Sequence, residues 1–267
     1  MDVAFQSQLI NEISHQQDLN NADQNQSLIK LATAQRINEA AVDTADLAMG
    51  MMFDAELAAL HAAELNAMDA LSMLDTAGST VEGAVELTMR AEELAIRANS
   101  SALTDAERGY IDAELQSIKG QLDDLSSTTF NDVAVFDSSL SFQLGDEMAD
   151  VVAVDIAAID AATLGMQNTS VDTMANASSA LADIQAGRDS LIAQAGAIGD
   201  ASAGIAMRAD NIRNQSIQVA TANSRIQDAD MAALATDLSQ TIVKQEAGAI
   251  AMSHAQANLS SFLMDTM

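Results

Sequence analysis

Residues 184–226 read IQAGRDSLIAQAGAIGDASAGIAMRADNIRNQSIQVATANSRI, and this stretch decides the fold. A large apolar residue recurs at every seventh position through it. A strict heptad repeat of this kind is typical of a long helix whose narrow apolar stripe lies along other helices. We expect the following residues to form the packing face of a long rod helix: Ile184, Leu191, Ile198, Ile205, Ile212, Val219 and Ile226.

The repeat has small or polar residues beside it and a break after it. A stripe of small side chains next to a stripe of large ones predicts a close approach of helices. The break falls at Gln227–Asp230, where Asp228 is expected to be the N-cap of the last helix. The small or polar positions are Ala195, Ser202, Ala209, Ser216 and Asn223.

The composition favours long helices over a compact core. The 267-residue chain has no proline, which would end a helix interior, and only 3% of its residues are aromatic. Many of the apolar residues are alanine, which favours helix but buries little surface. The predicted fold class is mainly α: an elongated rod of long antiparallel helices, with a small β-hairpin patch at the tip away from the termini.

The order of patterns along the chain predicts three regions. Helical spacing runs through residues 44–98, and Thr104-Asp105-Ala106-Glu107 reads as a capping box that opens another helix. Strand-like patterning is confined to residues 130–158. The expected organisation is an N-terminal arm (1–43), a rod with the β patch (44–226) and a C-terminal arm (227–267).

The net charge of −28, from 11 basic and 39 acidic residues, excludes nucleic acid as a main ligand. There is no cysteine, so neither disulfides nor thiolate chemistry is expected. The first residues lack a basic segment and an apolar core, so no secretory signal peptide is expected there. No apolar run approaches the length of a membrane span, so membrane insertion is not expected.

The sequence also predicts no enzyme, no metal site and no cofactor. The histidines His15, His61 and His254 are isolated, without a second ligand at metal-binding spacing. No phosphate-binding glycine loop, dinucleotide fingerprint or nucleophile elbow occurs. The acidic clusters lack the spacing of a calcium loop.

Several short stretches resemble bacterial flagellin, in a short form with only the two conserved core layers. The match that carries most weight is Ser224-Arg225-Ile226-Gln227-Asp228-Ala229-Asp230, and Arg36-Ile37-Asn38 followed by Asp43 is similar to a second family segment. The family-motif positions are therefore Arg36, Asn38, Arg225 and Asp228. Further similar stretches are Leu65–Ser72, Thr129–Val133, Gln245–Gly248 and Ala255–Asn258.

The resemblance implies a structural subunit that polymerises into the extracellular flagellar filament for swimming motility. Its partners would be further copies of itself, the flagellar type III export apparatus, a secretion chaperone, the filament cap and the hook-junction proteins. The two arms would form an inner coiled-coil layer of the filament. The expected subunit contacts in this layer are Leu9, Ile13, Leu28, Leu31, Leu234, Leu238, Ile242, Leu259 and Leu263.

The resemblance also implies a contact with the vertebrate Toll-like flagellin receptor. The candidate residues are Arg90 and Leu94, one helical turn apart, and Glu114 on the following helix. The competing interpretation is a packing leucine and two solvated charges.

Two other functions remain open at this stage. A hook–filament junction or flagellin-like adaptor protein would share the arms without forming long filaments. An acidic coiled-coil binding module would be a stable folded monomer or dimer.

Overall fold

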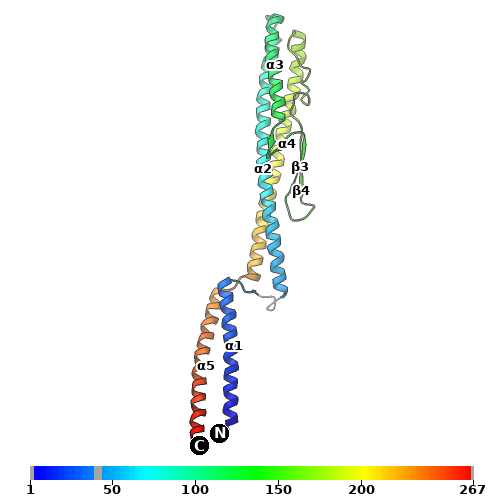
Figure 1. Ribbon diagram of the computed structural model, residues 1–267. Helices are drawn as coiled ribbons and strands as arrows, with labels where there is room; N and C mark the ends of the chain where they lie inside the picture. The colour runs from blue at the N-terminus through cyan, green and yellow to red at the C-terminus, as the bar shows by residue number, and fades with distance from the viewer. Residues whose placement is uncertain (1–2, 39–43, 266–267) are drawn as a thin grey trace. The chain divides into compact units, whose positions relative to one another are not determined.

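The computed structural model describes residues 3–38 and 44–265, and its elements are drawn in Figure 1. These residues form five helices and four short strands, which confirms the mainly α fold class with a small β patch. In chain order they are α1 (Val3–Thr33), α2 (Thr44–Ala98), α3 (Asp105–Ser126), β1 (Thr129–Phe130), β2 (Val133–Ala134), β3 (Ser138–Gln143), β4 (Val151–Ile156), α4 (Met174–Gln227) and α5 (Met231–Asp265).

The chain folds as two compact units. Unit 1 comprises residues 1–56 and 218–267, and unit 2 comprises residues 57–217. Unit 1 therefore holds α1, α5, the start of α2 and the end of α4. The units divide within α2 and α4, whereas the expected layer boundaries follow residues 43 and 226. The assignment of these regions to filament layers stays a prediction.

The turn between α2 and α3 is closed by a buried arginine. Arg108 is 5% exposed, and its Nε and Nη2 atoms donate to the carbonyl oxygens of Ala98 (2.8 Å) and Ser100 (2.7 Å). These bonds satisfy carbonyls that the end of α2 leaves without helical partners. The expected capping box is confirmed, since Thr104 and Glu107 bond reciprocally at the start of α3.

Two ion pairs give the direction of α4 relative to α2 in unit 2. Arg188 pairs with Glu92, and Arg213 Nη2 lies 2.9 Å from Glu64 Oε1. Because the later residue of α4 pairs with the earlier residue of α2, the two helices run antiparallel.

The buried face of α2 carries an alanine stripe. Six alanines recur every seven residues, and each is at most 2% exposed. Alanines at a seam let helix backbones approach closely, while larger side chains of neighbouring helices fill the space. The alanine stripe consists of Ala63, Ala70, Ala77, Ala84, Ala91 and Ala98.

The β patch consists of two antiparallel hairpins. Strands β1 and β2 join through Asn131 and Asp132, which both have positive φ, as a two-residue turn of type I′ requires. Strands β3 and β4 pair from Ser138↔Ile156 to Gln143↔Val151.

The position of the β patch differs from the expected tip. Asn66 Nδ2 donates to the carbonyl oxygen of Gln143 (3.0 Å), so the β3–β4 hairpin lies alongside α2 (Figure 1). The far end of unit 2 is instead the turn between α2 and α3. The reason is that the chain continues in the direction of α3 after Ser126, back along α2.

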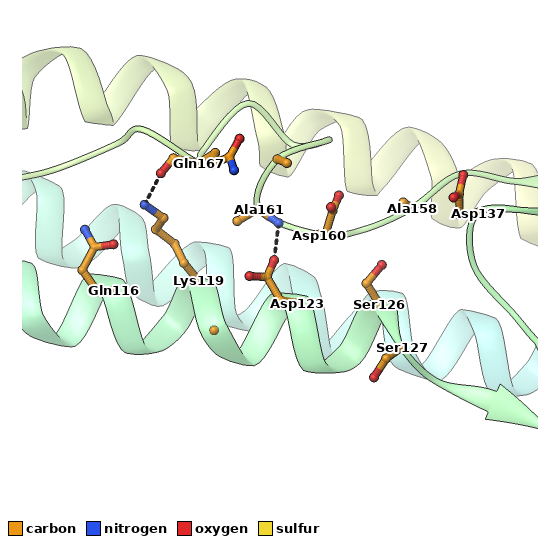
Figure 2. A pocket seen from close by; sticks show the side chains of 12 residues that line it. Gln116, Lys119, Asp123, Ser126, Ser127, Asp137, Ala158, Asp160, Ala161 and Gln167 are labelled. Carbon is orange, nitrogen blue, oxygen red and sulfur yellow. Dashed lines mark hydrogen bonds between the residues drawn. The ribbon is translucent and has the colours of Figure 1, made fainter.

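The irregular segment 157–173 is held by a polar ladder on α3. Side chains of α3 bond to successive backbone groups of this segment, and Figure 2 shows the bonds of Lys119 and Asp123. Because each bonded group is a backbone N–H or carbonyl, the ladder replaces the pairing that a strand or helix would supply. The polar ladder consists of Asp112, Gln116, Lys119, Asp123 and Ser126, at alternating spacings of four and three.

A pocket of about 700 Å³ lies along the polar ladder, and Figure 2 shows its lining. Lys119 and Asp123 both line it, and both already bond to the backbone of segment 157–173. The positions of Lys119 and Asp123 are therefore explained by their bonds to segment 157–173. No group of three metal-ligating side chains occurs within the described residues.

Candidate assembly interface

The seam between α1 and α5 in unit 1 is polar at its centre. Along both helices, half-buried or buried positions alternate at spacings of three and four, as in a coiled coil. Gln245 Nε2 donates to Asn21 Oδ1 (2.8 Å) and to Gln24 Oε1 (2.9 Å) across the seam. The seam residues are Ile10, Ile13, Gln17, Asn20, Gln24, Ser27 and Leu31 on α1, and Leu234, Leu238, Thr241, Gln245, Gly248, Met252 and Ala255 on α5.

Gly248 permits a close approach in the middle of the seam. A Cβ atom at this position would lie 3.3 Å from Gln17 Nε2 and 3.4 Å from its Cγ, which is tight packing. The centre of the seam, built from amides and a glycine, removes little apolar surface from water. The apolar contribution of the seam therefore comes from its ends, where Ile13, Leu31 and Leu234 are half-buried.

Large apolar side chains lie instead on the outer faces of α1 and α5. Val243 is 64% exposed and Ile250 is 59% exposed. An apolar groove of about 400 Å³ lies beside Val243, between Thr236 and Lys244. Exposed apolar side chains beside an apolar groove make this surface a candidate for contact with other molecules. We call the following set the outer apolar face: Leu9, Leu19, Leu28, Ile29, Ile242, Val243 and Ile250.

The structure distributes the expected subunit contacts between the seam and the outer apolar face. Leu9, Leu28 and Ile242 are exposed. The half-buried residues Ile13, Leu31, Leu234 and Leu238 belong to the seam. The side chains of Leu259 and Leu263 lie outside what the structure describes, and so does Asp43. The contacts expected from the sequence do not include the exposed residues Leu19, Ile29, Val243 and Ile250.

The seven expected packing residues of the rod helix lie along α4. Ile184, Leu191 and Ile205 are fully buried, Ile226 is half-buried, and Ile198, Ile212 and Val219 are at most 9% exposed. The small positions beside them, Ala195 to Asn223, are half-buried.

The motif residues lie where α1 and α5 join the rest of unit 1. Arg36 bonds to the end of α4, and Asn38 Nδ2 donates to the carbonyl oxygen of Gln35 (3.2 Å). Arg225 is exposed and makes no hydrogen bond or ion pair with another described residue. The expectation that Asp228 caps α5 is wrong. Asp230 is the N-cap, because its Oδ1 accepts from the N–H groups of Ala232 (2.9 Å) and Ala233 (3.1 Å).

The candidate receptor residues are only partly exposed. Arg90 forms a bidentate contact with Glu114 Oε1 (3.1 and 2.8 Å) and pairs with Glu93, which raises the Arg90 pKa through the hydrogen bonds to Glu114 and Glu93. Leu94 is 2% exposed, so its side chain packs in the interior of unit 2.

None of the helices within residues 3–38 and 44–265 has an apolar stretch that could cross a bilayer.

Curated relatives of the chain are flagellins. The flagellin of Shigella flexneri is 28% identical over 188 residues, covering 65% of this chain and 34% of the relative. The flagellin of Listeria innocua is 26% identical over 243 residues, covering 83% of this chain and 84% of the relative. The chain thus spans about a third of the Shigella protein and most of the Listeria protein.

Two solved structures share the fold. The crystal structure of Bacillus cereus flagellin has a TM-score of 0.51 at 20% identity, and the match covers 60% of this chain and 94% of that one. A Vibrio parahaemolyticus protein assigned as flagellar hook-associated has a TM-score of 0.59 at 10% identity, and the match covers 70% of this chain and 100% of that one. At these identities the likeness concerns the fold alone.

Family models agree with these relatives over most of the chain. The model of the bacterial flagellin C-terminal helical region matches residues 174–263. The adaptor and binding-module alternatives are therefore not favoured. The model of the bacterial flagellin N-terminal helical region matches residues 7–141, half of the chain, so the chain belongs to the bacterial flagellin family, a family of structural filament subunits.

Proposed function

We propose that copies of this chain polymerise into the flagellar filament through the outer apolar face of α1 and α5. The observation that carries the proposal is the inversion of polarity in this helix pair. Amides occupy the seam centre, while Ile29, Val243 and Ile250 are exposed outside it. Burial of this outer surface against other copies supplies free energy that the polar centre of the seam does not.

Unit 2 and the α1–α5 pair therefore have different roles in the filament. Unit 2 contains the buried stripes and folds within one copy. Residues 1–43 and 227–267 form the inner layer of the filament, and residues 44–226 form the rod layer. An interface between two different surfaces of identical copies produces a helical polymer when its rotation does not close into a ring.

The proposal extends to the partners of a filament subunit. These are the type III export apparatus, a secretion chaperone, the filament cap and the hook-junction proteins, and the assembled protein is extracellular. A vertebrate Toll-like receptor is a further proposed partner. Arg90 and Glu114 would make this contact, since the side chain of Leu94 is buried.

The experiment adds purified protein to filament fragments and follows elongation by electron microscopy. Wild-type protein should elongate the fragments, more strongly as salt rises, because the charge of −28 makes neighbouring copies repel. The double variant Val243→Asp/Ile250→Asp should not elongate them, because two carboxylates would enter an apolar contact.

The matched control is Gln256→Asp/Asn258→Asp, which adds the same charge at exposed polar positions of α5 that do not line the groove beside Val243. It should elongate like the wild type at high salt. Absence of elongation by the wild type at every salt concentration would contradict the proposal, and so would normal elongation by Val243→Asp/Ile250→Asp.

A further inference from the structure

Two segments that are 190 residues apart in sequence meet in unit 1. The N–H of Arg36 donates to the carbonyl oxygen of Gln227 (2.7 Å), and the N–H of Ala229 donates to that of Ala34 (3.0 Å). Between these bonds, Gln35 and Asp228 form an isolated antiparallel bridge. We call this junction of residues 34–36 with residues 226–229 the Arg36 clasp. It joins the two stretches with the clearest family resemblance.

The Arg36 side chain ties a third segment into the clasp. Its Nε and Nη2 atoms donate to the carbonyl oxygen of Ile226 (3.2 and 3.0 Å), and Nη2 lies 2.9 Å from Asp46 Oδ2. Ile226 is in the last turn of α4, whose carbonyls lack helical partners and carry partial negative charge. Asp46 is in the first turn of α2. One guanidinium therefore bridges the negative end of α4 and the start of α2.

The helix ends beneath the clasp are already packed against each other. Asn223 Nδ2 donates to Asp54 Oδ1 (2.7 Å), and Gln227 Nε2 donates to Asp54 Oδ2 (3.3 Å). Gly50 leaves room for Gln227, because a Cβ atom at residue 50 would lie 3.0 Å from Gln227 Cδ and Cγ, and closer still to its Nε2. The start of α2 and the end of α4 thus form a fixed base within unit 1.

We propose that Arg36 is a positioning residue for filament assembly, which locks the α1–α5 pair onto this base. The inference rests on the proposed function, because it concerns the orientation in which the outer apolar face is presented. Without the clasp, α1 and α5 reach the base only through residues 34–43 and the short connection 228–230. A surface held in its bound orientation loses less conformational freedom on binding.

The guanidinium is suited to this task by its shape. Arginine offers several N–H groups in a rigid planar fork, so it can bond a carbonyl and a carboxylate together. A lysine at residue 36 would bring one point charge and could not reproduce the paired contacts to Ile226.

The experiment measures orientation and assembly separately. The chain has no cysteine, so spin labels can be attached at single engineered cysteines on Met51 of α2 and Gln240 of α5, both exposed and both in unit 1. Wild-type protein should give one narrow distance distribution by pulsed electron resonance. Arg36→Ala should broaden it and raise the critical concentration for elongation about tenfold, and Arg36→Lys should restore little of either.

Arg225→Ala is the matched control for the distance measurement. It removes the same charge from the neighbouring motif, where the side chain is exposed and bonds to no other described residue. Its distribution should stay narrow. Asp46→Asn, which keeps the bonds to Ile226, should raise the critical concentration less than about fivefold. The helical signal of monomer should be retained in Arg36→Ala, because the clasp lies outside unit 2.

The outcomes separate the two proposals. A narrow distribution for Arg36→Ala, or normal elongation despite a broad one, overturns the role of Arg36. Full recovery with Arg36→Lys overturns it as well, because charge alone would then suffice. Failure of the wild type to elongate overturns the proposed function, whereas the distance measurement still tests the clasp.

Discussion

The Nζ atom of Lys119 on α3 lies 2.6 Å from the backbone carbonyl oxygen of Gln167, 48 residues later in the chain. It also lies 3.2 Å from the carbonyl oxygen of Thr169. Figure 2 shows the first of these bonds. The ammonium group is thus bonded to two backbone acceptors of an irregular segment, and Lys119 is 8% exposed. The lysine thus supplies a donor to the carbonyl of Gln167 and a second donor, beside Gln116, to that of Thr169.

Replacing this lysine should loosen segment 157–173. In Lys119→Met the apolar stem is retained, but the carbonyl of Gln167 loses the ammonium donor and that of Thr169 keeps only Gln116, which should lower the free energy of unfolding by about 1–3 kcal/mol. Urea unfolding followed by circular dichroism measures this change, and hydrogen exchange should quicken in the segment. Lys244→Met, at an exposed position, is the control. Equal stability of the two variants would show that Lys119 does not hold the segment.

The alanine stripe of α2 should not tolerate larger side chains. Ala84 is fully buried, so Ala84→Leu inserts three carbons into filled space and should destabilise unit 2 by about 1–3 kcal/mol. Ala62→Leu, on the exposed side of the same helix, should be nearly neutral. Thermal unfolding of both variants checks the difference. A stable Ala84→Leu protein would mean that the seam has unused space.

Replacing Ala34 with glycine should raise the free energy of unfolding. It follows the end of α1 with φ of 56°, a left-handed conformation in which Cβ crowds the backbone. Ala34→Gly removes this strain, and after the added freedom of the unfolded chain the gain should be about 0.5–1 kcal/mol. Hydrogen exchange in the last turn of α1 should slow. Faster exchange there would show that the alanine side chain contributes packing.

The capping box of α3 should be sensitive to pH. The backbone N–H and the hydroxyl of Thr104 donate to Glu107, and these bonds hold the pKa of the Glu107 carboxyl below its usual range. Because the folded pKa is lowered, the stabilisation is present above the ordinary glutamate pKa. It is lost as the pH falls through the lowered value.

A carboxyl titration by nuclear magnetic resonance checks this prediction. Thr104→Ala removes the hydroxyl donor and should raise the Glu107 pKa towards its usual value, whereas Thr76→Ala, in the middle of α2, should leave it unchanged. A Glu107 pKa that does not respond to Thr104→Ala would indicate that the backbone donor alone is responsible.

Local sequence patterns predicted the elements that are held by bonds between residues a few positions apart. The capping box at Thr104 and Glu107 is confirmed. The helix expected over residues 44–98 is α2 (Thr44–Ala98). In both cases the deciding bonds join residues a few positions apart. The N-cap of α5 was misplaced from Asp230 to Asp228, because two aspartates two residues apart offer the same local signal and only the path of the chain distinguishes them.

Local sequence patterns did not predict the features that depend on contacts between distant segments. The alanine stripe repeats every seven residues, yet alanine is so common in this chain that the repeat was not recognised. The polar ladder on α3 has coiled-coil spacing, but its partners are backbone groups, which carry no side-chain signature. The β patch lies alongside α2 and not at the tip, because the chain runs back along α2 after α3.

The sequence by itself determined that the chain is mainly helical, where α2 ends and α3 begins, and to which family it belongs. These properties depend on helix propensity, spacing and short motifs, which are written in contiguous residues. Only the tertiary structure decided that the centre of the α1–α5 seam is polar while large apolar residues such as Val243 are exposed, and that Arg36 joins three segments. The physical reason is that a residue's environment depends on the segments packed against it, and those segments are far away in the sequence.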